Sequence, residues 1–212
     1  MSDVKSVPAV VIRRLPRYYR YLGDLLKCNI TRISSGALSK KMNVTASQIR
    51  QDFNYFGGFG QQGYGYNVEY LYREIGEILG LNDGDTTIII GAGNLGKALA
   101  DYTGFEKRGF RLVGIFDNNP EIIGTRINNI VVSDVADLEE FVQNNRVDIG
   151  ILSVPKSEAE HIAKTLSDNG VCGLLNFCYT DLKLSENTVV ENVHLSDHLM
   201  MLSYNIKRQR ES

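Results

Sequence analysis

The sequence is poor in cysteine and has no long apolar run. Its three cysteines, Cys28, Cys172 and Cys178, are odd in number and lack C-x-x-C spacing, so neither a disulfide framework nor a zinc site is expected. No segment approaches the ~18 consecutive apolar residues that a membrane-spanning helix needs. We therefore expect a cytoplasmic protein with reduced thiols, no bound metal and no membrane partner.

The net charge of −2 conceals a strong asymmetry along the chain. Residues 1–68 carry ten Lys and Arg against three Asp, a net charge of +7, and the remainder carries −9. The length of 212 residues suits one large domain or two small ones. A basic module joined to an acidic one indicates that only the first meets a polyanion such as DNA.

The centre of the chain predicts a strand, a glycine turn and a helix. The β-branched run at residues 86–90 is followed by a G-x-G-x-x-G pattern. In dinucleotide-binding proteins the first glycine allows the tight turn, the second lets a pyrophosphate approach, and the third lets the helix pack on the strand. The predicted cofactor-binding turn comprises Gly91, Ala92, Gly93, Asn94, Leu95 and Gly96.

An acidic residue ends the next predicted strand. Residues 111–116 are strand-like, and Asp117 follows them, 26 positions after Gly91. A carboxylate there accepts hydrogen bonds from an adenosine ribose and repels the additional phosphate of NADP. The sequence therefore favours NAD(H) as the cofactor, with Asp117 and the adjacent Asn118 at its ribose.

The rest of this half predicts a parallel sheet covered by helices on both faces. Strands are expected at 129–132, 147–154, 171–177 and 188–194, with helices at 135–143 and 156–168. Ligands of such Rossmann-type, doubly wound α/β sheets lie beyond the carboxyl ends of the strands. The predicted pocket lining therefore includes Val154, Pro155, Asn176 and Phe177. Ser196 is expected to cap a terminal helix whose apolar stripe packs on its own sheet or on a partner subunit.

The first half predicts a helix-turn-helix, with helices at 16–27, from Ser34 or Ser35 to 42, and at 46–56, the last capped by Thr45. In the third helix, Ala46, Ile49, Phe53 and Phe56 recur on one face, which is expected to be the core face. Polar side chains suited to bases and phosphates in a major groove recur on another face: Ser47, Arg50, Gln51 and Asn54.

A glycine-rich and aromatic segment at 57–66 follows that helix and predicts a hairpin wing beside the DNA. A linking helix at 68–79 and a turn at 82–85 then separate the two halves. The expected division is a winged-helix DNA-binding domain at 1–81, a Rossmann NAD(H)-binding domain at 82–195 and a C-terminal helix at 196–212.

This combination of motifs resembles the Rex family of redox-sensing transcriptional repressors over nearly the full chain. The resembling stretches are Arg14-Leu15-Pro16, Tyr18-Tyr19-Arg20, Arg32-Ile33-Ser34-Ser35, Gln48-Ile49-Arg50, Tyr55-Phe56-Gly57, Gly63-Tyr64-Gly65-Tyr66, residues 91–96, residues 102–105, Phe116-Asp117 and Asn176-Phe177.

The resemblance implies a homodimer that binds an inverted-repeat operator when NADH is scarce and releases it when NADH binds. It implies that the C-terminal helix is exchanged between subunits, and that Arg20, Tyr102 and His194 of the other subunit link the nicotinamide ring to the dimer arrangement. The resemblance also places Tyr102 and Leu195 in the cofactor site. The remaining DNA-binding positions that it implies are Arg14, Arg32, Gln48, Gln62 and Tyr64.

Three positions depart from the family pattern. The family usually has an acidic residue where this chain has His194, and an imidazole does not hold Arg20 in an ion pair. We therefore expect weaker discrimination between NADH and NAD+. Gln51 and Gln62 stand where the family commonly has basic residues, and each lost phosphate contact lowers the salt slope of DNA binding by about one.

Two alternatives remain open. A small NAD-dependent oxidoreductase is disfavoured, because about 130 residues after the domain boundary leave no substrate domain and the three histidines lack an obvious acid-base partner. A regulator with the same DNA-binding module and another adenine nucleotide, such as coenzyme A, is the other alternative. Asp117 argues against a phosphorylated ribose.

Overall fold

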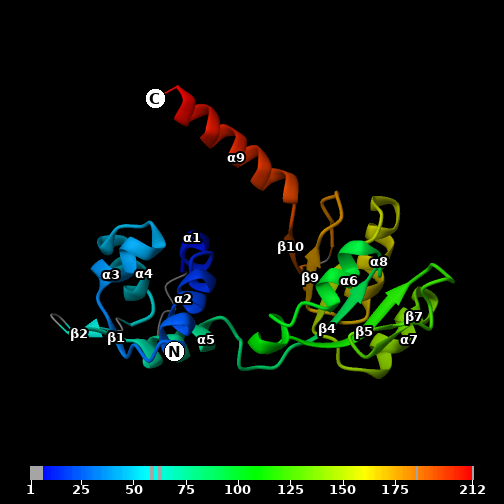
Figure 1. The fold of residues 1–212 in the computed structure, drawn as a ribbon. Helices are drawn as coiled ribbons and strands as arrows, with labels where there is room; N and C mark the ends of the chain where they lie inside the picture. Colours follow the sequence, from blue (N-terminus) through cyan, green and yellow to red (C-terminus); the bar gives the residue numbers. More distant parts are fainter. Residues whose placement is uncertain (1–6, 58–59, 62–63, 185, 212) are drawn as a thin grey trace. The chain divides into compact units, whose positions relative to one another are not determined.

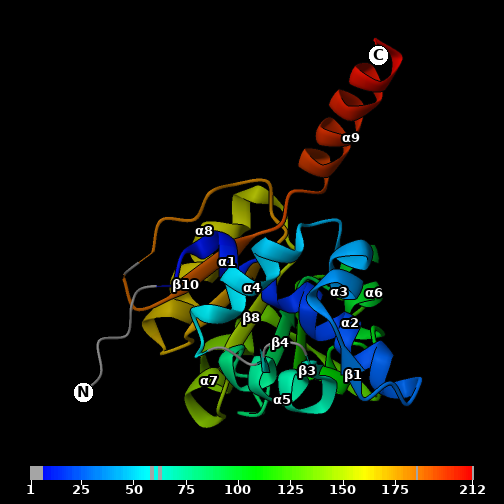
Figure 2. The ribbon, with the colours of Figure 1, turned by 90° about the vertical axis from the view of Figure 1, so that its left-hand side faces the viewer.

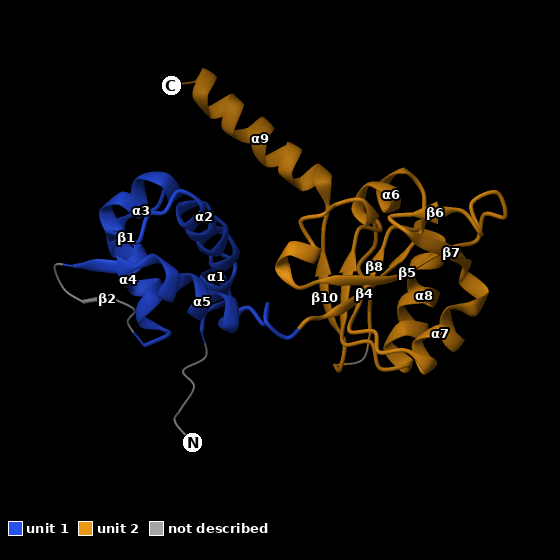
Figure 3. Cartoon of the chain, turned by 60° about the horizontal axis from the view of Figure 1, so that its bottom comes forward, with its two compact units in different colours: residues 1–83 blue, residues 84–212 orange. Residues whose placement is uncertain are grey.

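The computed structural model describes residues 7–57, 60–61, 64–184 and 186–211. The chain divides into two compact units, Met1–Asp83 and Gly84–Ser212 (Figure 3). Each unit has its own buried core: one cluster lies within the first unit, and the second unit has one cluster on each side of its sheet.

The first unit is a winged helix-turn-helix, as predicted (Figure 1). Its three short strands pair antiparallel in the order β1-β3-β2, and Tyr18, Ile49, Phe53 and Leu71 are among its fully buried side chains. Its elements are α1 (Ala9–Ile12), α2 (Leu15–Lys27), β1 (Arg32–Ile33), α3 (Ser35–Met42), α4 (Ala46–Asn54), β2 (Gly60–Gln61), β3 (Gly65–Asn67) and α5 (Val68–Ile78).

Side-chain caps set the starts of the two helix-turn-helix helices. Ser34 Oγ accepts a hydrogen bond from the Ala37 N–H at 3.0 Å, and Thr45 Oγ1 accepts from the Gln48 N–H at 3.1 Å. Asn43 ends α3 in the left-handed conformation, with φ of 51°. These caps agree with the sequence prediction.

Helix α4 ends two residues before the predicted position. The N–H groups of Tyr55 and Phe56 bond to carbonyls three residues back, and Gly57 then takes a φ of 99°. Such tightening is typical of a helix end, and a left-handed residue stops the helix. The prediction from apolar periodicity extended too far because Phe56 packs on the core from this last turn.

The second unit is built on a seven-stranded sheet in the order β10-β9-β8-β4-β5-β7-β6. All neighbours pair parallel except β6 and β7, so the predicted doubly wound Rossmann-type sheet is confirmed. Its strands are β4 (Thr86–Ile90), β5 (Arg111–Asp117), β6 (Arg126–Ile127), β7 (Ile130–Asp134), β8 (Ile149–Leu152), β9 (Gly173–Asn176) and β10 (Val189–Asn192).

Helices cover both faces of this sheet. On one face, side chains of α7 (Leu138–Asn144) and α8 (Lys156–Asp168) pack with Ile88 and Ile90 of β4. On the other face, α6 (Asn94–Ala100) packs with Ile89. The alternation of β4 side chains between the two cores explains why the whole strand is buried.

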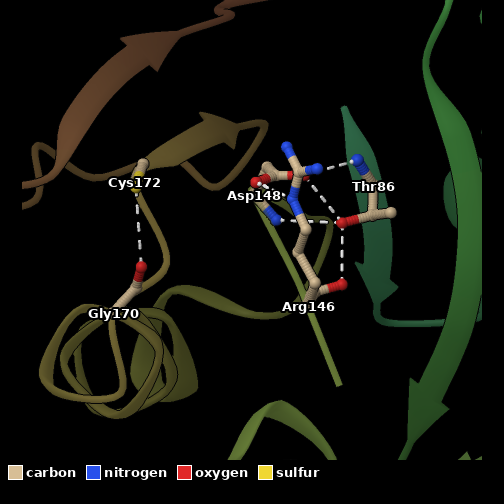
Figure 4. Close-up of polar contacts among 5 residues, drawn as sticks. All are labelled: Thr86, Arg146, Asp148, Gly170 and Cys172. Atoms are coloured by element: carbon tan, nitrogen blue, oxygen red, sulfur yellow. Dashed lines mark hydrogen bonds and ion pairs between the residues drawn. The ribbon is translucent and has the colours of Figure 1, made fainter. Parts of the chain in front are cut away.

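Strands β4 and β8 are joined at their amino ends by a polar cluster (Figure 4). Asp148 Oδ2 accepts from the Thr86 N–H at 2.8 Å, and Arg146 Nε donates to Asp148 Oδ1 at 2.9 Å. Burial opposes ionisation of Asp148, but the hydrogen bonds from Thr86 and Arg146 outweigh it and lower the pKa. The nearby Cys172 thiol lies 3.6 Å from the Gly170 carbonyl oxygen.

The C-terminal helix α9 (Leu195–Arg210) begins one residue before the expected start (Figure 2). Ser196 was predicted as its cap, and that prediction is wrong: the cap position is His194, and no side chain caps the helix. The Ser196 hydroxyl contacts the Tyr179 hydroxyl instead.

Two kinds of feature are absent from the described residues. No helix among them combines the length and apolar character needed to cross a membrane. Within the same residues, no three His, Cys, Asp or Glu side chains gather as a metal site would require.

Candidate functional site

The glycine turn after β4 is held by close packing against β8. Gly91 has a φ of +98°, and a Cβ placed on it would lie 2.5 Å from the Ser153 carbonyl oxygen. A Cβ on Gly96 would lie 1.8 Å from the Gly91 carbonyl oxygen. A Cβ on Gly93 would meet no atom within 4 Å. Gly91 and Gly96 are therefore required by the fold, and Gly93 leaves open space above the turn.

Asp117 closes the turn from the end of β5. Its Oδ2 accepts from the Ala92 N–H at 2.6 Å, and its Oδ1 accepts from the Asn119 N–H at 2.8 Å. A carboxylate has about four acceptor positions, so each oxygen can accept one further hydrogen bond. The Ala92 N–H itself is occupied by Asp117, which removes it from the donors available to a ligand.

A cavity of about 460 Å³ opens beside this turn, at the carboxyl ends of β4, β5 and β8. This volume lies within the range of small-molecule sites. Six residues predicted to bind the cofactor line it: Gly91, Gly93, Asp117, Asn118, Val154 and Pro155.

The sequence reasoning missed the far wall of the cavity. That wall comes from the segment after β7 and from one face of α8, and its residues include Val135, Ala136, Leu138, Glu139, Glu158, His161, Ile162 and Thr165. The spacing of the α8 residues places them on one helix face, which is the pattern that could have identified them. Apart from His161, the ionisable side chains that line the cavity are acidic.

The other predicted cofactor residues do not line this cavity. Ala92, Asn94, Leu95 and Gly96 belong to the turn and to α6, and Leu195 opens α9. Tyr102 is 53% exposed and lines a separate cavity of about 270 Å³. Its ring packs edge-on against the Phe105 ring, with the two centroids 5.0 Å apart.

The amide of Asn176 makes hydrogen bonds within the second unit. Asn176 is fully buried, its Nδ2 donates to the Thr180 carbonyl and to Asn192 Oδ1, and its Oδ1 accepts from the Cys178 N–H. Its amide therefore orders the loop after β9 and ties that loop to β10. Phe177 packs into the core on the α6 face.

In the first unit, the structure separates the two predicted faces of α4. Ile49 and Phe53 are buried. The four side chains proposed for the major groove are all exposed: Ser47, Arg50, Gln51 and Asn54. The Arg50 guanidinium donates to Ser35 Oγ at 3.1 Å, which holds it near the start of α3.

The structure describes only part of the wing. Tyr64 is 72% exposed, and Arg32 on β1 donates to its carbonyl oxygen at 3.2 Å. Gln62 lies outside the described residues. Arg14 and Gln48 are two further predicted DNA-binding residues, and both donate hydrogen bonds to the buried carboxylate of Asp52. The sequence analysis did not single out Asp52.

Asp52 is fully buried and accepts four hydrogen bonds. Burial opposes its ionisation, but donors from Arg14, Gln48 and Tyr18 outweigh that cost and lower its pKa. Burial, followed by the hydrogen bond to Asp52, raises the pKa of Tyr18.

The proposed switch residues belong to different units. Arg20 is exposed on α2. Tyr102 and His194 belong to the second unit, where the His194 ring lies 5.3 Å from the Tyr179 ring. His194 Nδ1 is buried and has no hydrogen-bond partner among the described residues.

Two family models match the chain, one in each unit. Residues 6–54 match "Putative DNA-binding protein N-terminus", and residues 82–180 match "CoA binding domain".

Full-length relatives share one description. A redox-sensing transcriptional repressor Rex of Thermoanaerobacter pseudethanolicus is 54% identical, over 99% of this chain and 93% of its own. The Rex protein of Clostridium tetani is 50% identical, over 100% of both chains.

Solved structures of RSP, a Rex-family repressor, match the whole fold. RSP in complex with NAD+ and operator DNA has a TM-score of 0.90 and 55% identity, over 96% of this chain and 94% of that chain. RSP in complex with NADH has a TM-score of 0.89 and 52% identity, over 97% of both chains.

Proposed function

Since this chain belongs to the Rex family of redox-sensing transcriptional repressors, we propose that it binds an inverted-repeat operator as a homodimer and releases it when NADH binds. The observation that carries the proposal is the pairing of two sites in one chain. One unit presents a polar, exposed face on α4, and the other holds a glycine turn beside a cavity that Asp117 lines.

The cavity suits the adenosine half of NAD(H). The open space above Gly93 admits a pyrophosphate, and the remaining acceptor positions of Asp117 suit ribose hydroxyls. The apolar walls at Val135, Val154 and Pro155 suit an adenine ring. We assign the nicotinamide end to the region of Tyr102, Asn176, Phe177 and Leu195.

The DNA site is assigned to α4 and the wing. Arg50 suits guanine, and Gln51 and Asn54 suit adenine, in a major groove. Arg32 and Tyr64 then lie on the wing beside the backbone or the minor groove. A repressor of this kind works in the cytoplasm, where a bacterial operator lies.

The terminal helix supports a dimer. None of the residues of α9 is buried, and its exposed apolar side chains include Leu199, Met200, Leu202 and Tyr204. Exposed apolar side chains gathered on one element mark an interaction surface. We assign this stripe to a second copy of the chain, with Arg20, Tyr102 and the other copy's His194 coupling cofactor to dimer arrangement.

The coupling requires no reaction at the nicotinamide ring, so we propose a regulator and not an enzyme. NADH can release DNA only if it binds one arrangement of the dimer more tightly than the other. The arrangement that it favours must be the one that cannot bind DNA. The operator must then weaken NADH binding by the same factor.

Fluorescence polarisation tests the proposal with an inverted-repeat duplex selected from a randomised library. We expect binding by the dimer, loss of binding with NADH, and retention with NAD+ at the same salt concentration. Binding that is indifferent to both nucleotides would contradict the proposed signal.

A second candidate ligand is coenzyme A, which the match of residues 82–180 to a CoA-binding family favours. Against it, Asp117, Glu139 and Glu158 surround the cavity with negative charge and repel the phosphorylated ribose of coenzyme A. A thermal-shift panel separates the candidates, because a ligand at 100 times its Kd adds ~2.7 kcal/mol of stability.

A further inference from the structure

Beneath the exposed face of α4 lies a closed cluster around the carboxylate of Asp52. Its Oδ1 accepts from Arg14 Nη2 at 2.7 Å and from Gln48 Nε2 at 2.9 Å. Its Oδ2 accepts from Arg14 Nε at 2.7 Å and from the Tyr18 hydroxyl at 2.8 Å. These four donors fill the acceptor capacity of the carboxylate.

The cluster decides which way the Gln48 amide points. An ionised carboxylate accepts hydrogen bonds and has none to donate, so the Gln48 atom that faces Asp52 must be Nε2. The amide oxygen Oε1 then faces away from Asp52. One N–H of Nε2 is used by Asp52, and Oε1 with the second N–H forms the free edge of the amide.

That free edge has the donor and acceptor pattern that adenine requires. Glutamine pairs with adenine by accepting from N6 and donating to N7. Gln48 is half-buried at the border between the core face and the exposed face, in the first turn of α4. The first turn of a recognition helix is the part that contacts base edges.

We propose that Asp52 is a positioning residue for base recognition, which holds the Gln48 amide in the orientation that reads an adenine in each half-site. This inference rests on the proposed operator binding. Asp52 is fully buried and acts only through Gln48, while Arg14 keeps the carboxylate ionised.

The test compares base preferences, which a loss of stability alone does not change. Wild-type protein and variants are each bound to a library of randomised duplexes, and the bound fraction is sequenced. For Gln48→Met we expect the preference at one position of each half-site to fall about tenfold. For Asp52→Asn we expect the base preference at the same position to change. An asparagine amide also donates hydrogen bonds, so the Gln48 amide can flip and face it with Oε1.

Two further variants separate positioning from folding. Tyr18→Phe removes one donor to Asp52 and leaves Gln48 in place, so we expect lower stability with the wild-type preference. The double variant Arg14→Met/Asp52→Leu removes the ion pair without leaving a buried charge, which usually preserves folding. This double variant frees the Gln48 amide. We expect it to change the base preference at the same position of the half-site as Gln48→Met does.

The outcomes are distinguishable. If the wild-type protein selects no inverted repeat, the proposed function is overturned together with this inference. If it does select one, and the folded Asp52 variants keep the preference that Gln48→Met loses, only the positioning role is overturned. An unchanged preference in Gln48→Met overturns it as well.

Discussion

At the scale of single residues, one carboxylate organises the local geometry of each proposed site. Asp52 joins α4 to α2 through Arg14 and Tyr18, and Asp117 joins the end of β5 to the glycine turn through the Ala92 N–H. Both carboxylates owe their place to hydrogen bonds with defined donors. Replacing either one leaves donors without a partner, which costs more than the net value of the bonds.

Acid should destabilise the first unit through Asp52. Its folded pKa is lowered below the ordinary value of 3.8, so its stabilisation is complete above that value and is lost as the pH falls through the folded pKa. We expect the free energy of unfolding to fall below about pH 4 and to fall less steeply in Asp52→Asn. The pKa of Asp148 is also lowered, so Asp148 contributes to the pH dependence in the same direction, and Asp148→Asn is the matched control. Chemical unfolding between pH 3 and 7 measures the free energy of unfolding of the wild type and of both variants.

His194 makes a prediction about cofactor discrimination. His194 Nδ1 is buried and has no hydrogen-bond partner in the part of the chain that the structure describes, and an imidazole supplies no carboxylate to Arg20 or Tyr102. His194→Asp should therefore increase the ratio of NAD+ to NADH dissociation constants, by several-fold for one charged hydrogen bond. Direct titration measures it, and a large NADH preference that the substitution leaves unchanged would contradict the idea.

At the scale of secondary-structure elements, α2 and α5 pack through a reciprocal pair of glycines and tyrosines. The Tyr19 and Tyr72 rings stack with centroids 4.1 Å apart. A Cβ on Gly23 would lie 3.1 Å from the Tyr72 ring, and a Cβ on Gly76 would lie 3.1 Å from the Tyr19 ring. The missing Cβ atoms at Gly23 and Gly76 therefore leave room for the two rings to stack between the helices.

A bulky side chain at this crossing should force the helices apart. We expect Gly76→Leu to destabilise the first unit by about 1–3 kcal/mol, as overpacking does. Gly36→Ala is the control, since its Cβ would meet only Ser34 Oγ at 3.8 Å in an exposed part of α3. It should stabilise by roughly 0.5–1 kcal/mol, and equal thermal melts for the two variants would refute the packing argument.

At the scale of the whole molecule, the two units divide the work. The basic residues concentrate in the unit with the helix-turn-helix, and three acidic side chains, Asp117, Glu139 and Glu158, line the proposed nucleotide cavity of the other. A charge division of this kind directs DNA to one unit only. We expect communication between the units to depend on the proposed dimer, for which α9 offers exposed apolar side chains.

Charges on α9 should separate the subunits. We expect Leu199→Glu/Leu202→Glu to give monomers in analytical ultracentrifugation, because burying two carboxylates in an apolar interface is unfavourable. Affinity for an inverted-repeat duplex should fall by more than tenfold, while NADH binding to the second unit persists. As a control, Asp197→Asn changes an exposed charge in the first turn and should leave the dimer intact.

Local sequence patterns were sufficient for the main helices and strands of both units and for the glycine turn, but not for the short strands β1 and β6 or for the cap of α9. Apolar periodicity, caps such as Thr45 and the order of strands and helices act over a few neighbouring residues, so they can be recognised without coordinates. The two faces of α4 follow from the same periodicity. The family assignment also came from short motifs along the chain.

Tertiary structure alone decided which polar side chains are free. Arg14, Gln48 and Asn176 each bond to a partner from a distant segment or a neighbouring helical turn, which no local sequence pattern indicated. The α8 wall of the cavity likewise depends on how that helix crosses the sheet. Hydrogen-bond partners and pocket walls join residues far apart in the chain, and only folding brings those residues within reach.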